Sequence, residues 1–272
     1  MLYLIATPIG NLGDITYRAV ETLQSCNEIW CEDTRQTVKL LNHLNIKKPL
    51  VSCHEYTQKE KAPQLMEKLR AGMDVAYVSD AGMPGISDPG AVLVRSCIEA
   101  GLPYTVLPGS SAVLTAAVLS GLPLDRFAFF GFLPRESMER KKALHDLASY
   151  GATVILYESP HRVKDTLRDV LDVAGDCPCA LVRELTKVHE SCQRGLISEV
   201  LWALPDEVRG ECVLLFSVPP KQEEVPSKED LDGLLLRLMD HMTLKDAARE
   251  ASEALKLPKK QVYARALELK NE

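Results

Sequence analysis

The segment Ser79-Asp80-Ala81-Gly82-Met83-Pro84-Gly85-Ile86-Ser87-Asp88-Pro89-Gly90 directly follows the apolar run Val75-Ala76-Tyr77-Val78. Three glycines and two prolines within twelve residues cannot continue a strand or a helix, so the chain leaves the predicted strand in a fixed loop with an accessible backbone. We expect Asp88 to cap, and Pro89 to begin, a helix that continues over residues 91–100. Ligands of open α/β sheets bind beyond the carboxyl ends of strands, so the segment predicts either a ligand-binding loop or a tight connection without a ligand.

The same order of strand, short loop and helix recurs throughout residues 1–121. Loops rich in small or polar residues follow other apolar runs at residues 7–14, 32–35 and 108–112. This alternation predicts a mainly parallel sheet. The first of these loops lacks G-x-G spacing, and no G-x-x-x-x-G-K-[ST] occurs in the chain, so neither a dinucleotide fingerprint nor a P-loop is expected.

A second α/β domain is predicted for residues 122–218, because apolar runs and polar loops resume there after a Gly-Leu-Pro turn. Short separations between its later strands predict that part of this second sheet is antiparallel. Residues 219–228 contain three prolines and several charges and are typical of a linker. Residues 229–272 show helical spacing with a helix-turn-helix rhythm. The predicted domains are therefore 1–121, 122–218 and 229–272.

The composition is that of a soluble globular protein, with 46% hydrophobic and 26% charged residues among 272. A net charge of −6 argues against a protein that coats nucleic acid non-specifically, but it allows a local basic face. The apolar start at residues 2–6 is too short for a signal peptide or a membrane span, so we expect a cytoplasmic protein without membrane contact.

Eight cysteines raise the question of a metal site or disulfides, but none forms a C-x-x-C pair. Most lie within apolar runs, where a free thiol behaves as a small hydrophobic side chain. We therefore expect no metal and no disulfides.

A candidate polar site follows the apolar run Ile29-Trp30-Cys31, where Glu32, Asp33, Thr34 and Arg35 come in succession. Acidic, hydroxyl and guanidinium groups at a strand end are suited to binding or catalysis. They are equally suited to a structural role, in which Asp33 or Thr34 caps the next helix and Arg35 pairs with Glu32. The sequence alone leaves both interpretations open.

The last thirty residues, 243–272, have seven Lys and Arg against five Asp and Glu, a net charge of +2 in an otherwise acidic chain. Lys256, Lys259 and Lys260, here called the lysine cluster, lie together at a predicted turn between helices. A phosphate backbone could dock on the lysine cluster, or the cluster could be a solvated charged face.

Six loop motifs, taken in order, resemble those of the tetrapyrrole methylase superfamily. They are T-P-I-G-N-L-G-D, S-D-A-G-M-P-G-I-S-D-P-G, P-G-S-S-A, F-x-G-F-L-P-R, E-S-P-H-R and R-E-L-T-K-x-H-E. Within the superfamily they are most similar to the bacterial enzymes that methylate the ribose 2′-hydroxyl of a cytidine in the decoding region of 16S ribosomal RNA. The match spans residues 1–218, and the helical tail resembles the C-terminal domain of the same family.

This resemblance implies two α/β domains with a cleft between them for S-adenosylmethionine, a small C-terminal helical domain, and usually a homodimer. It also implies 16S ribosomal RNA, within the small ribosomal subunit, as the partner. Matched by motif position, the implied cofactor contacts are Pro8, Ala81, Gly82, Met83, Ile86, Ser111, Ala112, Glu158 and Leu185.

Methyl transfer to a ribose hydroxyl needs alignment of the reactants and a route for the hydroxyl proton, but no metal. We predict that Glu32 or Asp33 accepts the proton and that Arg35 and Lys187 position the negatively charged RNA. Two alternatives stay open. One is a methyltransferase that acts on a tetrapyrrole or another small molecule, and the other is a catalytically inactive RNA-binding assembly factor.

Overall fold

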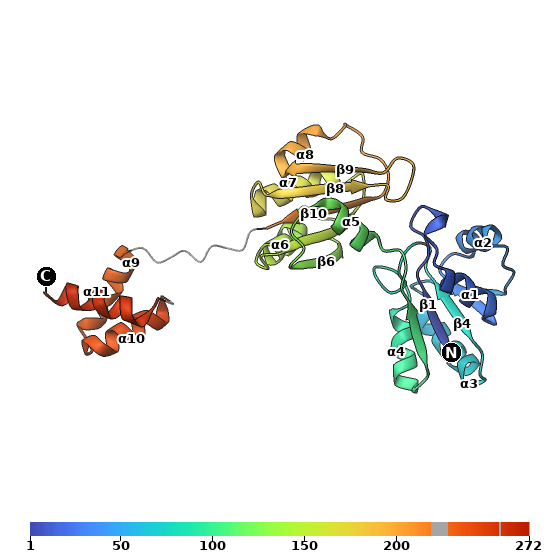
Figure 1. The fold of residues 1–272 in the computed structure, drawn as a ribbon, viewed down its shortest axis with the longest axis horizontal. Helices are drawn as coiled ribbons and strands as arrows, with labels where there is room; N and C mark the ends of the chain where they lie inside the picture. Colours follow the sequence, from blue (N-terminus) through green and yellow to red (C-terminus); the bar gives the residue numbers. More distant parts are fainter. Residues whose placement is uncertain (219–227, 256, 272) are drawn as a thin grey trace. The chain divides into compact units, whose positions relative to one another are not determined.

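The computed structural model describes residues 1–218, 228–255 and 257–271 and forms two compact units, Met1–Pro219 and Pro220–Glu272 (Figure 1). The strands of the first unit are β1 (Leu2–Ile5), β2 (Glu28–Cys31), β3 (Leu50–Ser52), β4 (Val75–Val78), β5 (Tyr104–Leu107), β6 (Phe127–Phe132), β7 (Thr153–Glu158), β8 (Pro178–Arg183), β9 (Ser191–Leu196) and β10 (Cys212–Ser217). Its helices are η1 (Leu12–Asp14), α1 (Tyr17–Ser25), α2 (Thr34–His43), α3 (Gln58–Arg70), α4 (Ala91–Ala100), α5 (Ala112–Ser120), α6 (Ser137–Ala148), α7 (Val163–Ala174) and α8 (Ile197–Ala203).

The first sheet is entirely parallel and has the strand order β3-β2-β4-β1-β5, which confirms the predicted parallel arrangement. Both faces are covered (Figure 1). Leu65 of α3 and Leu93 of α4 pack on one face, and Leu23 of α1 and Leu41 of α2 pack on the other. Burial on both faces explains why the strands are continuous apolar runs rather than alternating ones.

The second sheet has the order β6-β7-β10-β8-β9, and only the pair β6 and β7 is parallel. The expectation of antiparallel pairing in this part of the chain is therefore confirmed. Helices α6, α7 and α8 cover one face, where Leu214 is buried, and α5 covers the other, where Leu215 is buried. Although α5 precedes the second sheet and lies within the predicted first domain, Val113, Ala116 and Ala117 pack against this second sheet.

The helix α4 begins later than the sequence indicates. Its first residue is Ala91 and its N-cap is Gly90, which has a φ of +132° and makes no side-chain cap hydrogen bond. The predicted cap by Asp88 is therefore wrong. A Cβ on Gly90 would lie 3.2 Å from the Gly85 nitrogen and 3.3 Å from the Tyr77 ring, so only glycine fits where the helix starts.

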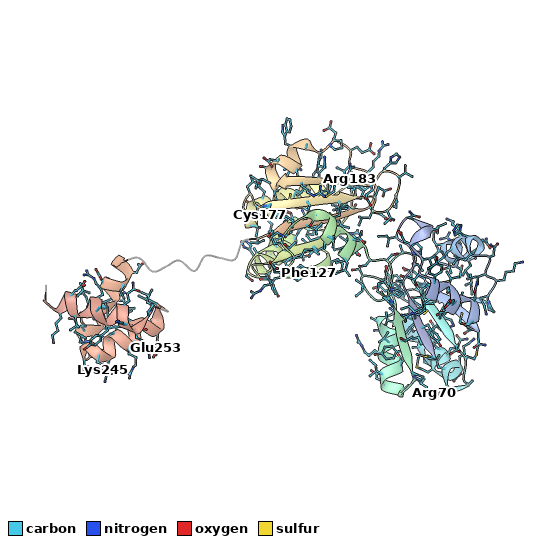
Figure 2. The ribbon with its side chains drawn as sticks, viewed as in Figure 1. Arg70, Phe127, Cys177, Arg183, Lys245 and Glu253 are labelled. Carbon is cyan, nitrogen blue, oxygen red and sulfur yellow. The ribbon has the colours of Figure 1, made fainter. Side chains whose placement is uncertain are left out.

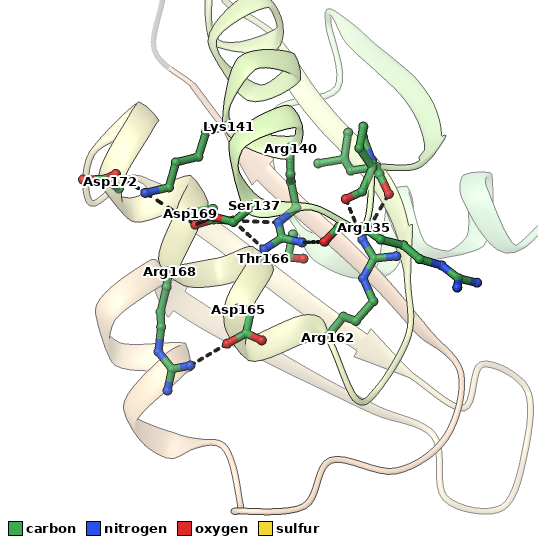
Figure 3. Close-up of polar contacts among 12 residues, drawn as sticks. Arg135, Ser137, Arg140, Lys141, Arg162, Asp165, Thr166, Arg168, Asp169 and Asp172 are labelled. Carbon is green, nitrogen blue, oxygen red and sulfur yellow. Dashed lines mark hydrogen bonds and ion pairs between the residues drawn. The ribbon is translucent and has the colours of Figure 1, made fainter.

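A buried ion pair links α6 to α7 (Figure 3). Arg140 lies 2.6 Å from Asp169, and the two side chains are only 5% and 10% exposed. Arg140 also donates from Nη1 to the carbonyl of Arg135, at 2.8 Å, and Ser137 donates to both carboxylate oxygens of Asp169. Because the guanidinium and the carboxylate both have further hydrogen bonds, the pair fixes the connection between β6 and α6 against α7.

The second unit is a bundle of α9 (Lys228–Met239), α10 (Leu244–Ala254) and α11 (Lys259–Asn271). Leu235, Ala251 and Val262 form the centre of its core. Thr243 caps α10, and its hydroxyl accepts a hydrogen bond from the Asp246 N–H. Lys245 and Glu253 lie on the exposed surface of the bundle (Figure 2). Among the described residues, no helix combines the length and hydrophobicity needed to cross a membrane.

All eight cysteines are free, and seven of them are buried. Burial raises the pKa of the Cys53 thiol to about 11 and that of Cys179 to about 12, so these thiols are neutral at physiological pH. They act as small apolar side chains, in agreement with the sequence.

Candidate active site

A pocket of about 530 Å³ lies in the first unit where loops from both sheets meet. The carboxyl ends of β4 and β5 face it from the first sheet, and the carboxyl ends of β6, β7 and β8 face it from the second. This is the edge at which ligands bind in open α/β folds. The lining residues are Ile9, Ala81, Gly82, Met83, Ile86, Ser87, Asp88, Ser111, Ala112, Phe132, Tyr157, Glu158, Ser159, Pro160, Glu184, Gly210, Glu211, Cys212 and Val213.

The loop after β4 is held to the loop after β1 by a two-way backbone bridge. Thr7 donates its N–H to the Gly82 carbonyl at 2.9 Å, and Gly82 donates its N–H to the Thr7 carbonyl at 3.0 Å. Gly82 has a φ of +79°, which other residues rarely adopt. Neither Ala81 nor Met83 donates its backbone N–H within the described part of the chain. The two neighbours of Gly82, both of which line the pocket, therefore keep backbone donors that the described residues do not use.

On the opposite wall, Glu158 at the end of β7 is almost completely buried. Its Oε2 accepts a hydrogen bond from the hydroxyl of Thr166 at 2.6 Å, and its Oε1 accepts one from the Ser159 N–H at 2.7 Å. The guanidinium of Arg162 lies 3.5 Å from the same carboxylate. Arg162 in turn donates to the carbonyls of Leu133 and Pro134 (Figure 3). The charge of Glu158 is thus balanced by groups close to its own strand.

A second charge network lies at the rim. The Nζ of Lys187 is 2.9 Å from Glu184 and 3.0 Å from Glu211, both of which line the pocket. Hydrogen bonds from the Glu211 N–H and from Lys187 lower the pKa of Glu184. A Cβ on Gly10 would lie 2.6 Å from Lys187 Cγ, so only glycine lets the loop after β1 approach this network.

Aromatic rings form part of the wall. The rings of Phe132 and Tyr157 both line the pocket, with centroids 5.6 Å apart, and Phe129 packs edge-on against Tyr157 at 4.8 Å. Burial, together with the negative charge of Asp88, raises the pKa of Tyr157 to about 12. The ring is therefore neutral and offers an apolar surface with one hydroxyl.

Asp88 also lines the pocket, and burial raises its pKa to about 6. Negative charges on Glu32 and Asp80 add to this shift, and the nearby Ser79 hydroxyl, which donates to the Gly82 carbonyl at 3.3 Å, opposes it in part. Sequence reasoning missed this residue because an aspartate followed by proline is a common helix start. Its place in a glycine-rich loop after a buried strand was the available signal.

Seven of the nine predicted cofactor contacts line the pocket, and two do not. Pro8 is next to Ile9, which lines it, and Leu185 is next to Glu184, which does. The side chain of Leu185 instead packs in the core beneath α5. The seven that the structure brings together are Ala81, Gly82, Met83, Ile86, Ser111, Ala112 and Glu158.

None of the four predicted catalytic residues lines the pocket. Asp33 caps α2, accepts from the Arg35 N–H at 2.8 Å and pairs with the Arg35 guanidinium at 2.7 Å, which lowers the pKa of Asp33 to about 2. Glu32 lies nearby, and burial and the charge of Asp80 raise its pKa. Lys187 is committed to its two rim carboxylates. In the structural role considered from the sequence, Arg35 would pair with Glu32. It pairs with Asp33 instead.

Of the lysine cluster, Lys259 and Lys260 are exposed in the first turn of α11, and Lys259 lies 3.8 Å from Glu253. Lys256 lies outside the described residues.

Residues 1–201 match the family model of the tetrapyrrole (corrin/porphyrin) methylases, and residues 225–270 match that of the RsmI C-terminal HTH domain. A ribosomal RNA small subunit methyltransferase I of Synechocystis is 43% identical over 99% of this chain and 98% of its own length. One of Vibrio cholerae is 44% identical over 98% of this chain and 94% of its own length.

Solved structures share the fold at lower identity. The uroporphyrin III C-methyltransferase of Thermus thermophilus is 21% identical with a TM-score of 0.57, covering 79% of this chain and 96% of that one. A diphthine synthase is 14% identical with a TM-score of 0.60, covering 79% and 89%. From the family models and the high identity over nearly its whole length, the chain belongs to the tetrapyrrole methylases, within the family of the ribosomal RNA small subunit methyltransferases I, and is an S-adenosylmethionine-dependent methyltransferase.

Proposed function

We propose that this protein methylates the ribose 2′-hydroxyl of a cytidine in the decoding region of 16S ribosomal RNA. The observation that supports this most is the identity of 43% over 99% of the chain to a relative named for the small ribosomal subunit. The tail adds support, because its match to a helix-turn-helix domain is separate from the match of the first unit. Helix-turn-helix modules commonly bind nucleic acid.

The pocket has the chemistry that S-adenosylmethionine requires. Its volume of about 530 Å³ lies in the usual range for sites of small ligands. The Phe132 and Tyr157 rings offer apolar surface for a purine, and the unused N–H groups of Ala81 and Met83 offer hydrogen bonds to its polar edges. Acidic residues at the rim suit a cationic ligand. We propose that the seven contacts named above hold the cofactor, mainly through the backbone of the loop 79–90.

When bound, S-adenosylmethionine supplies a methyl group already activated by a sulfonium charge. The protein then has three tasks: to align the hydroxyl with the methyl group, to exclude water and to receive the hydroxyl proton. The apolar walls, with Ile9, Met83 and Val213, exclude water. The open rim leaves room for a nucleotide to approach.

The proposal is tested with purified protein in two steps. Titration calorimetry with S-adenosylmethionine should show binding, and absence of binding would favour the inactive assembly factor. Transfer of a labelled methyl group is then measured on small ribosomal subunits, on naked 16S RNA and on a tetrapyrrole precursor. We expect label in the RNA as a 2′-O-methylcytidine, found by nuclease digestion and mass spectrometry. Label in the tetrapyrrole alone would overturn the proposal.

We further propose that the protein works as a homodimer in the cytoplasm, where its ribosomal substrate is found. Light scattering coupled to size exclusion gives the mass in solution. The mass of the chain is 30.1 kDa, so a particle of that mass would contradict the dimer.

A further inference from the structure

The loop between β6 and α6, residues 133–136, begins at the wall of the pocket. Phe132, the last residue of β6, lines the pocket and is 59% exposed. Arg135 follows three residues later, so its Cα lies at most roughly 11 Å from that of Phe132. The loop therefore lies beside any nucleotide that enters the pocket past Phe132.

Two guanidinium groups hold the backbone of this loop. Arg162 donates from Nη2 to the carbonyls of Leu133 and Pro134, at 3.0 Å each. Arg140 donates from Nη1 to the carbonyl of Arg135 at 2.8 Å (Figure 3). Three successive carbonyls thus accept hydrogen bonds from charged donors, which are stronger than bonds between neutral groups. These bonds fix the backbone of the loop and use none of its side chains.

The side chain of Arg135 takes no part in these contacts. It is exposed, and its guanidinium forms no hydrogen bond or ion pair with any described residue. Figure 3 shows this side chain extending away from Arg140 and Arg162. The structure thus presents an unpaired guanidinium on a backbone that is held in place.

The other lysines and arginines within three residues of a lining residue are paired or half-buried. The pairs are Arg162 with Glu158, Lys187 with Glu184 and Glu211, and Arg209 with Glu207. Arg183 is half-buried, and its Nε is buried. Because the lining carboxylates are negative, they repel an RNA phosphate that approaches the pocket unless a cation receives it. Among the described residues of these segments, Arg135 is the exposed arginine that is available for this.

We propose that Arg135 binds a phosphate of the ribosomal RNA next to the nucleotide that enters the pocket. This inference rests on the proposed function, since it requires RNA as the substrate. A guanidinium holds a phosphate through two parallel hydrogen bonds, which fix both position and orientation. Contacts with phosphate place a nucleic acid without reading its sequence. Arg135 thereby positions the RNA strand, and Arg140 and Arg162 position the loop that carries Arg135.

The test compares Arg135→Ala and Arg135→Lys with Arg70→Ala as the control. Arg70, the last residue of α3, is also exposed and has no ion pair among the described residues. It lies at the edge of the first sheet opposite to the pocket, because α3 ends where the chain returns to the amino end of β4 (Figure 2). The two arginines therefore match in exposure and charge and differ in their position relative to the pocket.

Binding of each variant to small ribosomal subunits is measured by filter binding at several salt concentrations. Arg135→Ala should weaken binding by roughly 10- to 100-fold, the usual contribution of a hydrogen bond between charged groups. It should also reduce the slope of log affinity against log salt by about 0.7. Arg135→Lys keeps the charge but loses the bidentate contact, so the slope should be retained while part of the affinity is lost. Arg70→Ala should match the wild type in both.

Further measurements separate RNA binding from folding and from the cofactor site. Replacing the side chain leaves the carbonyl of residue 135 in place, so its hydrogen bond with Arg140 persists. The melting temperature should therefore stay within about 2 °C of the wild type. Calorimetry should show an unchanged affinity for S-adenosylmethionine. In single-turnover methylation, Arg135→Ala should raise the half-saturating concentration of small subunits more than it lowers the rate at saturation.

The outcomes separate the two proposals. If the wild type methylates small-subunit RNA and Arg135→Ala binds small subunits with the affinity and salt slope of the wild type, only the role of Arg135 is overturned. The same conclusion follows if Arg70→Ala loses as much affinity as Arg135→Ala, since the loss would then reflect net charge alone. If the wild type methylates no RNA, the proposed function falls, and the assignment of Arg135 falls with it.

Discussion

Gly82 is the residue at which the pocket depends most directly on backbone conformation. Its φ of +79° and its paired hydrogen bonds with Thr7 place the loop 79–90 against the pocket. Gly72 has a similar φ of +83° but does not line the pocket, and a Cβ added to it would meet no atom within 4 Å. A substitution at Gly72 therefore strains the backbone away from the pocket, and a substitution at Gly82 strains it at the pocket. Comparing the two variants distinguishes a general loss of stability from a loss of ligand binding.

We expect Gly82→Val to weaken S-adenosylmethionine binding by on the order of tenfold or more, equivalent to about 1.4 kcal/mol. Gly72→Val imposes a comparable backbone strain of roughly 1–2 kcal/mol and should leave the affinity unchanged. Titration calorimetry and thermal melts on both variants check this. Equal affinities in the two variants would remove Gly82 from the binding site.

Lys187 is predicted to stabilise the rim in a pH-dependent way. The pKa of Glu184 is lower in the folded state than in the unfolded state. The ionised Glu184 carboxylate therefore stabilises the fold at pH values above its ordinary pKa, and this stabilisation is lost as the pH falls through the pKa of the folded state. Lys187→Met leaves Glu184 and Glu211 without their shared cation. The variant should therefore lose most melting temperature near neutral pH and little in acid below the folded pKa of Glu184. A pH-independent loss would show that Lys187 contributes through packing alone.

At the scale of secondary structure elements, a buried ion pair between Arg140 and Asp169 joins α6 to α7, beside the more exposed contacts of Lys141 with Asp169 and Asp172. Removing one partner of such a pair leaves an uncompensated buried charge. Arg140→Ala should reduce the free energy of unfolding by about 3 kcal/mol, because the buried Asp169 keeps only Lys141, 3.7 Å away, and the Ser137 hydroxyl as partners.

The pair Arg168 and Asp165, on the outer face of α7, is the matched control (Figure 3). Its side chains are 60% and 62% exposed, so Arg168→Ala should cost less than about 1 kcal/mol. Denaturant unfolding of both variants measures the difference. If the two losses were similar, burial would not be what makes the Arg140 pair important.

At the scale of the whole molecule, residues 243–272 have a net positive charge although the chain as a whole is acidic. A local excess of basic groups of this kind is what RNA binding would require. Replacing Lys256, Lys259 and Lys260 together by alanine should weaken RNA binding and reduce the slope of log affinity against log salt by about 2, since each lost phosphate contact removes about 0.7. Filter binding at several salt concentrations gives the slope. Affinity for S-adenosylmethionine serves as the internal control, and an unaltered slope would assign the lysine cluster to a solvated face.

Much of the architecture could be predicted because its signals are local. The alternation of apolar runs, glycine-rich loops and helical spacing predicted the parallel first sheet, the mixed second sheet and the helical tail. Motif resemblance then selected nine cofactor contacts, seven of which line one pocket. The four predicted catalytic residues do not line this pocket, and their role stays a prediction, because a polar group at a strand end has the same local pattern whether it caps a helix, as Asp33 does, or faces a ligand.

The sequence by itself determined the order of strands and helices and the family, since both depend on neighbours within a few residues. Only the tertiary structure decided which charges are free. Lys187 is neutralised by Glu184, three residues away, and by Glu211, 24 residues away beyond β9 and α8. Asp88 is left without a cation among the described residues, and the geometry at Gly90 starts α4 beyond it. Charge balance in a pocket is set by contacts between segments that are distant in the sequence, and these contacts form only when the strands pair into sheets.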